Sequence, residues 1–144
     1  MNCCRLRELI LRSPASKLYR GIIKITTKRK LGKGLWVVFL NPYDQEIGHY
    51  TGLYVKDDDE AWFFNSLGYE NGYEQVKELL SPFSTTFNVD SLQSRTSDVC
   101  ALYVIYFFAR VAEGATFDEF LNEFGSEPLT NDLYVYTRAK SYYN

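Results

Sequence analysis

The segment that most constrains this fold is VCALYVIYFFARV, residues 99–111, in which Arg110 is the only charged residue. It is long enough for about three and a half turns of α-helix, and it is shorter than the roughly 18 apolar residues of a membrane-spanning helix. A helix that is apolar nearly all round is buried on most of its faces. The sequence therefore predicts a central helix in a single-core domain, which a chain of 144 residues is long enough to build.

Three short apolar segments precede this helix and are typical of strands. They cover residues 35–40, 47–55 and 61–64, and each ends at turn-forming residues such as Asn41-Pro42 or Asp57-Asp58-Asp59. Because the loops between them are short, they predict an antiparallel meander. Periodicity further predicts a basic helix at 5–12, a helix at 74–80, an outer strand at 85–89, and amphipathic segments at 116–124 and 129–142. The expected fold class is α+β, with a small, mostly antiparallel sheet packed against the central buried helix.

The net charge of −2 conceals an uneven distribution. Residues 1–33 carry ten Lys or Arg residues and one acidic residue, whereas the remaining 111 residues carry six basic and 17 acidic ones. We therefore divide the chain into a basic N-terminal arm or helix, residues 1–33, and a main domain, residues 34–144. The arm either meets the acidic remainder or contacts an external polyanion such as DNA. The candidate nucleic-acid-binding residues are Arg5, Arg7, Arg12, Lys28, Arg29 and Lys30.

Cysteine and histidine counts limit the available chemistry. Three cysteines, two of them adjacent at Cys3-Cys4, form neither a disulfide framework nor zinc-ribbon spacing. The single histidine, His49, excludes a multi-histidine metal site and is the one imidazole available to any mechanism. We expect a reducing compartment, no metal and no cofactor. We expect no secretion, because the amino end lacks the apolar stretch of a signal peptide. We expect no membrane contact, because no apolar run approaches the roughly 18 residues of a spanning helix.

Cys100 stands at the start of the predicted central helix, after the capping residues Thr96-Ser97-Asp98. With Ser97 as N-cap, Cys100 falls in the first turn. There the unpaired N–H groups and the positive end of the helix dipole favour a thiolate. This position predicts a nucleophile, although a cysteine at the head of an apolar helix is also an ordinary core residue.

A cysteine nucleophile needs a base, a group that orients the base, and donors for the developing oxyanion. His49 is the candidate base. Asn65, at the end of the next strand, is the candidate orienting group, although an Asn before Ser-Leu-Gly is equally typical of a turn. If Asn65 does not orient the ring, one of Asp57, Asp58 and Asp59 is the alternative. Gln93, seven residues before Cys100, is the candidate oxyanion donor together with the Cys100 amide.

The order of these residues resembles that of the adenovirus protease (adenain) and of the related peptidases specific for ubiquitin-like proteins. The resemblance rests on Gly-His-Tyr at 48–50, Trp-Phe-Phe-Asn-Ser-Leu-Gly at 62–68, and a glutamine just before a cysteine-led apolar helix. It covers about residues 35–112. It implies a thiol protease fold in which His49 is the general base, Asn65 orients it, Cys100 attacks the scissile carbonyl, and Gln93 contributes to the oxyanion hole.

The chain departs from the family pattern in four ways. Asn65 replaces an acidic residue, Tyr50 replaces the Trp that follows the histidine, Ala101 replaces the Gly that follows the cysteine, and the chain is shorter. None of these changes removes a reacting group. The cysteine that pairs with an activating peptide in adenain has no counterpart, so we predict no disulfide activation.

The resemblance implies a cysteine endopeptidase that cleaves viral precursor or structural proteins during virion maturation, in the virion and in the nucleus or cytoplasm of a host cell. Its expected partner is a protein substrate, with a DNA contact through the basic arm. Two alternatives stay open: a protease that deconjugates ubiquitin-like modifiers, and a catalytically degenerate module that binds nucleic acid or protein.

Overall fold

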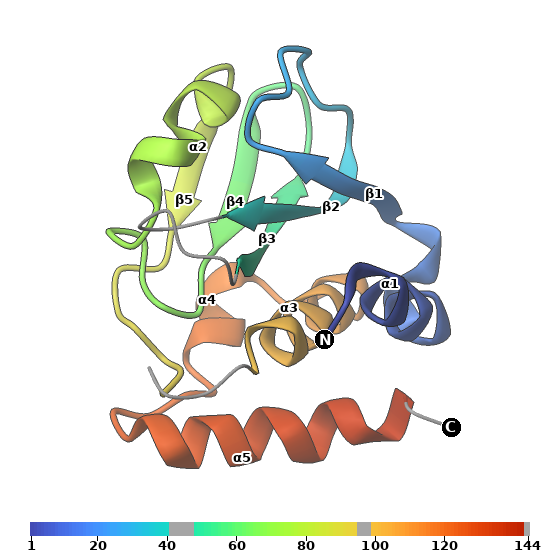
Figure 1. The fold of residues 1–144 in the computed structure, drawn as a ribbon, viewed down its shortest axis with the longest axis vertical. Helices are drawn as coiled ribbons and strands as arrows, with labels where there is room; N and C mark the ends of the chain where they lie inside the picture. The colour runs from blue at the N-terminus through green and yellow to red at the C-terminus, as the bar shows by residue number, and fades with distance from the viewer. Residues whose placement is uncertain (41–47, 95–98, 143–144) are drawn as a thin grey trace.

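A five-stranded sheet with helices on both faces forms the fold (Figure 1). The structure is a computed structural model that describes residues 1–40, 48–94 and 99–142. Its strands are β1 (Tyr19–Lys24), β2 (Gly34–Leu40), β3 (His49–Val55), β4 (Glu60–Phe64) and β5 (Ser84–Phe87). Its α-helices are α1 (Cys3–Arg12), α2 (Tyr73–Leu80), α3 (Cys100–Ala112), α4 (Phe117–Leu121) and α5 (Pro128–Ala139), and 3-10 turns cover Pro14–Lys17 and Lys140–Tyr142.

The strands lie in sequence order, β1-β2-β3-β4-β5. The pairs β2–β3 and β3–β4 are antiparallel, which confirms the predicted meander. The two edge pairs, β1–β2 and β4–β5, are parallel, so the sheet is mixed and the expectation of a mostly antiparallel sheet is wrong at both edges. In each edge pair the connection brings the chain back to the end where the first strand began, so that the second strand runs the same way. Residues 25–33 make this connection between β1 and β2, and a segment containing α2 makes it between β4 and β5.

The sheet separates two hydrophobic clusters, as the alternation of side chains along each strand requires. On one face Val37 and Phe64 pack with α1, α3, α4 and α5, and on the other Val38 and Phe63 pack with α2. The predicted central helix is confirmed as α3, in which every residue from Cys100 to Ala109 is buried. The α+β class is therefore confirmed.

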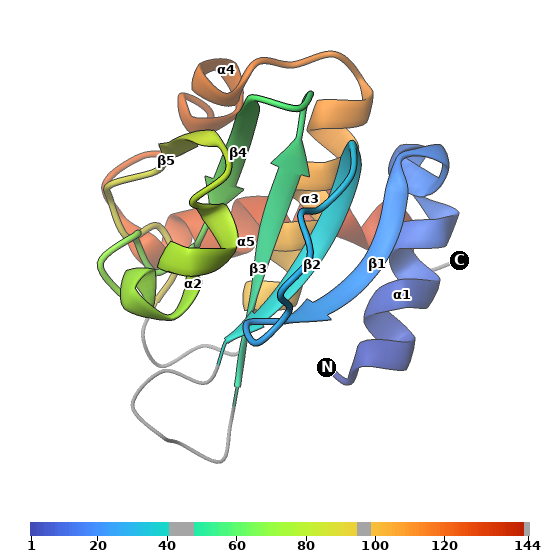
Figure 2. The ribbon, with the colours of Figure 1, turned by 90° about the horizontal axis from the view of Figure 1, so that it is seen from above.

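Residues 1–33, expected as a basic arm or helix, contribute side chains to both hydrophobic clusters. The predicted helix is α1, whose Leu6, Leu9 and Ile10 are fully buried beside α3. The segment also supplies β1, which pairs with β2, and Figure 2 shows α1 running beside β1. Along the described residues, no helix has the length and apolar character that crossing a membrane requires.

One close approach sets the spacing between the sheet and α3. Gly52 in β3 lies against two rings of the helix, and a Cβ at this position would come within 2.9 Å of Phe107 and 3.0 Å of Phe108. The absence of a side chain lets α3 pack tightly along β3. Figure 2 shows that the two elements begin at the same end of the molecule, which is the end that carries the candidate site.

Candidate active site

His49 and Asn65 meet at the open end of the β3–β4 hairpin. His49 is the first residue of β3 and Asn65 directly follows β4, whose last pairing joins Phe64 to Gly52. The His49 Nε2 and the Asn65 Oδ1 are 2.7 Å apart. Both residues are buried, with exposed fractions of 5% and 0%. The antiparallel hairpin thus brings together two polar residues 16 positions apart in the sequence.

The hydrogen bonds around Asn65 determine which ring nitrogen of His49 carries the proton. The Leu67 N–H donates to Asn65 Oδ1 at 2.9 Å, and Asn65 Nδ2 donates to the Asn71 carbonyl at 2.6 Å. These contacts fix the amide with its oxygen toward His49, so the ring nitrogen facing it is a donor. Nε2 therefore carries the proton, and Nδ1 has the lone pair that a general base needs. A carboxylate at position 65 has no hydrogen to give the Asn71 carbonyl, which explains why an amide fits here.

A second amide holds Asn65 by its backbone. Asn88 follows β5, and its Oδ1 accepts from the Asn65 N–H at 2.9 Å while its Nδ2 donates to the Asn65 carbonyl at 2.6 Å. Through these two hydrogen bonds the Asn88 side chain pairs with the Asn65 backbone as a neighbouring strand would, just beyond the end of the β4–β5 pairing. Asn88 is a site residue that the sequence analysis missed, because an asparagine after a strand is an ordinary turn residue.

Burial sets the protonation state of His49. It lowers the pKa of His49 below its usual value of 6.5, and the hydrogen bond to Asn65 opposes this effect without overcoming it. The ring is therefore neutral at pH 7, and its Nδ1 is available to accept a proton.

Ser66 connects Asn65 to Gln93. The Ser66 carbonyl accepts from the N–H groups of Leu92 and Gln93, at 2.8 and 3.1 Å. The Ser66 hydroxyl donates to the Gln93 Oε1, and Gln93 is 3% exposed. Since Oε1 is the end of the amide that meets Ser66, the Nε2 end is the one able to donate to an oxyanion.

Cys100 is the first residue of α3, as expected, with Val99 at the N-cap position. The prediction that Ser97 is the N-cap is therefore wrong, and Val99 makes no side-chain capping bond. Ser97 itself lies outside the described residues, as do Asn41 and Ile47 at the predicted strand ends. Tyr50, next to His49, has a raised pKa because of burial first and then its electrostatic interactions with Cys3, Cys100 and Cys4. β3 and α3 begin at the same end of the molecule, so Cys100 lies at the His49 end of β3. One hydrogen bond joins His49 to Asn65 and another joins Ser66, the next residue, to Gln93. Cys100 is placed by the packing of α3 on β3.

The acidic turn serves a different purpose. The Asp57 carboxylate accepts from the Asp59 and Glu60 N–H groups, both at 2.8 Å, in the turn between β3 and β4. This turn is at the opposite end of the hairpin from His49. The alternative in which Asp57, Asp58 or Asp59 orients His49 is therefore wrong, and Asn65 is the residue that binds the ring.

The predicted nucleic-acid-binding residues have contacts within the protein. Arg5 and Arg12 form ion pairs with Glu8 at 3.0 and 2.7 Å, and Lys28 lies 3.8 Å from Glu78. Arg29 lies over the Trp36 ring and Lys30 over the Phe83 ring, each 5.4 Å from the ring centroid. Arg7 lowers the pKa of Tyr19, although burial raises that pKa more. Binding of nucleic acid by these residues stays a prediction.

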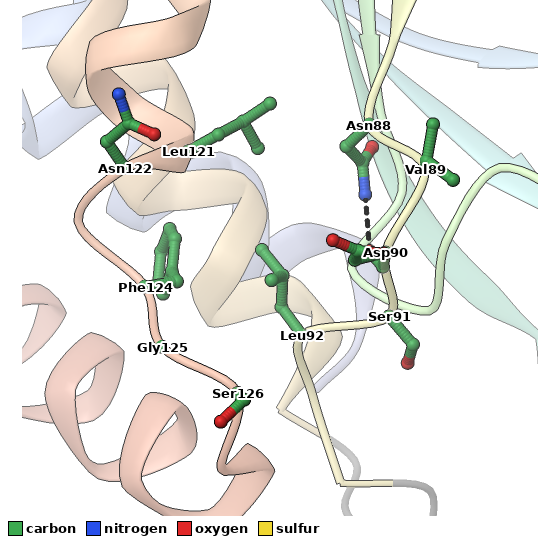
Figure 3. Close-up of a pocket in the computed structure, with 10 residues that line it drawn as sticks. All are labelled: Asn88, Val89, Asp90, Ser91, Leu92, Leu121, Asn122, Phe124, Gly125 and Ser126. Atoms are coloured by element: carbon green, nitrogen blue, oxygen red, sulfur yellow. Dashed lines mark hydrogen bonds between the residues drawn. The ribbon is translucent and has the colours of Figure 1, made fainter.

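Two pockets adjoin the site. The segment 88–92, which leads into Gln93, forms one wall of a pocket of about 640 Å³ whose other wall is residues 121–126 (Figure 3). An apolar pocket of about 280 Å³ is lined by Tyr50, Phe39, Cys3 and three residues of β1. Across the described ranges, no group of three or more His, Cys, Asp or Glu side chains is placed to hold a metal ion.

No protein-family model matches this chain, and a search of curated proteins finds no match. A similar solved structure is the central domain of the uncharacterized Lpg1148 protein from Legionella pneumophila. It has 8% sequence identity and a TM-score of 0.47, over 94% of each chain. At this level of similarity it indicates neither a family nor a function for the present chain.

Proposed function

We propose that this chain is a cysteine endopeptidase of the adenain type, with Cys100 as nucleophile and His49 as general base. The observation that carries the proposal is the 2.7 Å contact between His49 Nε2 and Asn65 Oδ1 in a buried setting, at the end of β3 where α3 also begins. Thiol catalysis uses an imidazole held through one nitrogen and a cysteine in the first turn of a helix, and this chain has both groups at the same end of the sheet.

The mechanism follows from the proton positions. His49 Nδ1 accepts the proton of the Cys100 thiol, and the sulfur attacks the scissile carbonyl. The new oxyanion accepts hydrogen bonds from the Gln93 amide and the Cys100 N–H. When the C–N bond breaks, His49 returns the proton to the leaving amine, and water then hydrolyses the thioester. Asn65 keeps the Nε2–H in place throughout, and it steadies the imidazolium with a dipole rather than a full charge.

The proposed substrates are viral precursor and structural proteins cleaved during particle maturation, as the sequence resemblance implies. An extended substrate would lie across the His49 end of the sheet, between the two pockets beside Tyr50 and Leu92. The same chemistry would serve a protease that removes ubiquitin-like modifiers, and the choice between these substrates is made by the experiment below.

The test uses the full chain with Cys3→Ser and Cys4→Ser, because these two cysteines are exposed and Cys100 is buried. A peptide library read by mass spectrometry measures endopeptidase activity, and p-nitrophenyl acetate measures acylation of the remaining thiol. In the ester reaction an S–C bond forms, the C–O bond breaks and p-nitrophenolate leaves. We expect Cys100→Ala to abolish both activities while the circular dichroism spectrum stays unchanged.

Peptide cleavage that persists in the Cys100→Ala variant would overturn the proposal. Trapping of a modifier-linked probe on Cys100, together with an intact peptide library, would replace endopeptidase activity with deconjugation.

A further inference from the structure

The short segment 92–94, which carries the proposed oxyanion donor, is held from two sides. On the side of β4, the Ser66 carbonyl accepts from Leu92 and Gln93. On the opposite side, α5 supplies two adjacent residues. Asn131 Nδ2 donates to the Leu92 carbonyl at 3.1 Å, and the Asp132 carboxylate accepts from the Ser94 N–H at 3.3 Å. The backbone around Gln93 is therefore held by Ser66, which follows β4, on one side and by Asn131 and Asp132 of α5 on the other.

Asp132 also binds the helix that begins with Cys100. The Tyr103 hydroxyl donates to Asp132 Oδ1 at 2.7 Å, and Tyr103 is fully buried one turn after Cys100. The same hydroxyl lies 3.4 Å from the Leu92 carbonyl. The pKa of Tyr103 is raised, by burial first and then by its bond to Asp132, so the phenol stays a donor. One carboxylate thus connects the first turns of α3 to the Gln93 segment.

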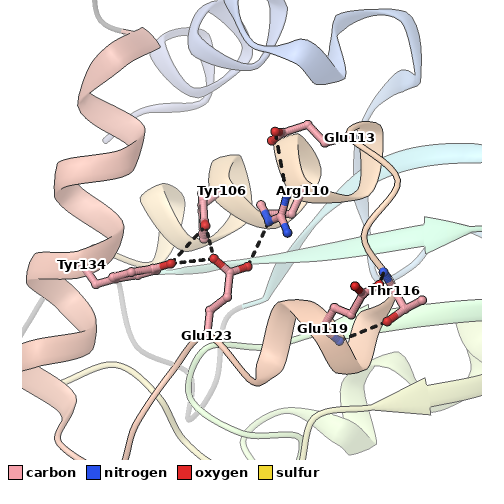
Figure 4. A network of polar contacts seen from close by, with 7 residues as sticks. All are labelled: Tyr106, Arg110, Glu113, Thr116, Glu119, Glu123 and Tyr134. Carbon is pink, nitrogen blue, oxygen red and sulfur yellow. Dashed lines mark hydrogen bonds and ion pairs between the residues drawn. The ribbon is translucent and has the colours of Figure 1, made fainter.

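A polar network fixes α5 itself against α3 (Figure 4). Glu123 accepts from the hydroxyls of Tyr106 in α3 and Tyr134 in α5, and from Arg110 Nε at 3.0 Å. Burial would raise the pKa of Glu123, but these three donors together hold it below its usual value. The carboxylate is therefore ionised at neutral pH, and α5 has a link to α3 in addition to the one through Asp132.

Asn131 ties the same helix turn to the pocket wall. It is 3% exposed, and its amide exchanges hydrogen bonds with the backbone of Gly125, at 3.0 and 2.9 Å. Its remaining donor reaches Leu92, so one side chain binds both the pocket wall at Gly125 and the segment before Gln93.

We infer that Asp132, supported by Asn131, is a positioning residue that places the Gln93 amide for oxyanion stabilisation. The inference rests on the proposed function. Neither residue belongs to the set expected from the sequence, and neither touches the reacting atoms. Their effect passes through the backbone of residues 92–94 and through Tyr103.

The experiment compares two reactions of Cys100 in the Cys3→Ser, Cys4→Ser chain. Acylation by p-nitrophenyl acetate passes through an oxyanion, whereas alkylation by iodoacetamide does not. We expect Asp132→Ala to slow acylation about ten-fold, a part of the effect of losing an oxyanion-hole donor, and to leave alkylation unchanged. Asp132→Asn keeps the Oδ1 atom that accepts from both Ser94 and Tyr103, so it should restore acylation to near the parent rate.

Three further variants make the result decisive. In a Gln93→Ala background, Asp132→Ala should cause no further loss of acylation, because the two act through one group. Asp58→Ala, the same substitution in the exposed β3–β4 turn, should change neither reaction. If Asp132→Ala fails to fold, Tyr103→Phe tests the same link, and it should slow acylation but not alkylation.

The outcomes separate the two proposals. If Gln93→Ala slows acylation while Asp132→Ala and Tyr103→Phe do not, the positioning role is overturned and the proposed function stands. Equal loss of acylation and alkylation in Asp132→Ala, or additive losses with Gln93→Ala, would likewise overturn it, because both indicate a general structural role. If the parent chain is not acylated at Cys100, the proposed function fails, and the inference fails with it.

Discussion

The β3–β4 hairpin carries polar side chains at both ends, and the two ends are held in different ways. At the turn, Asp57 binds backbone N–H groups two and three residues away, and it is exposed. At the open end, His49 binds Asn65, Asn65 binds Asn88, and Ser66 binds Gln93, over separations of 16, 23 and 27 residues, and all of these are buried. A turn needs its own few residues, whereas the candidate site needs the whole sheet to be assembled.

The largest expected difference between the two ends follows from removing Asn65. Asn65→Ala leaves the His49 Nε2–H, the Leu67 N–H and the Asn71 carbonyl without their partner. We expect a loss of about 3 kcal/mol in the free energy of unfolding, since each buried unsatisfied group costs about 1–3 kcal/mol. Urea denaturation measures this loss, with Asp57→Ala as the matched substitution at the turn. A larger loss for Asp57→Ala would contradict the comparison.

The same contrast explains what the sequence could predict. The strands β2, β3 and β4 follow from continuous apolar runs, and α3 from a segment with one charge in 13 residues. β1 is missing from the prediction because its sequence, YRGIIK, carries two charges and a glycine, as suits an edge strand. Its parallel pairing depends on the path of residues 25–33, for which local sequence has no signal.

The candidate site divides in the same way. His49, Asn65 and Gln93 were predicted from chemical type and order along the chain, and the first two are hydrogen-bonded partners. Asn88, Asn131 and Asp132 were missed because their partners are backbone groups of distant segments. Every residue has a backbone N–H or carbonyl group, so the sequence does not indicate which one a side chain will bind. These contacts can be recognised once the fold is known.

Replacing Asn65 by Asp sharpens the comparison at the open end. The carboxylate adds a negative charge beside the His49 ring, so the pKa of His49 should rise above that of the parent protein. The variant also loses the donor to Asn71, and we expect it to be about 1–2 kcal/mol less stable. Because the chain has one histidine, a single imidazole signal in a proton NMR titration reports the pKa. An unchanged or lower value would contradict the placement of the residue 65 side chain against the His49 ring.

The acid sensitivity of the open end is the next smaller effect. Because burial lowers the pKa of His49, the unfolded chain binds more protons than the native protein just below pH 6.5. The contribution of a neutral His49 is complete above pH 6.5, and it is lost as the pH falls toward the native pKa. The slope is at most about 1.4 kcal/mol per pH unit for one proton. Urea midpoints between pH 7.5 and 5.5 should fall for the parent and stay level for His49→Gln; parallel curves would assign the loss to other groups.

The smallest effect belongs to the turn, and it occurs in a different pH range. Hydrogen bonds from the Asp59 and Glu60 N–H groups lower the pKa of Asp57 below 3.8, so its contribution is complete above that value and is lost on further acidification. Asp57→Asn keeps an oxygen that accepts both N–H groups but does not titrate. Its urea midpoint should fall slightly at pH 7, and the difference from the parent should shrink below pH 3.8.

The same Asp57→Asn variant tests whether the two ends of the hairpin are independent. The His49 pKa and the rate of Cys100 acylation should stay at parent values, because the turn and the open end share no hydrogen bond among the described contacts. A shift in either quantity would mean that the hairpin transmits strain along its length, and the two ends would no longer be independent.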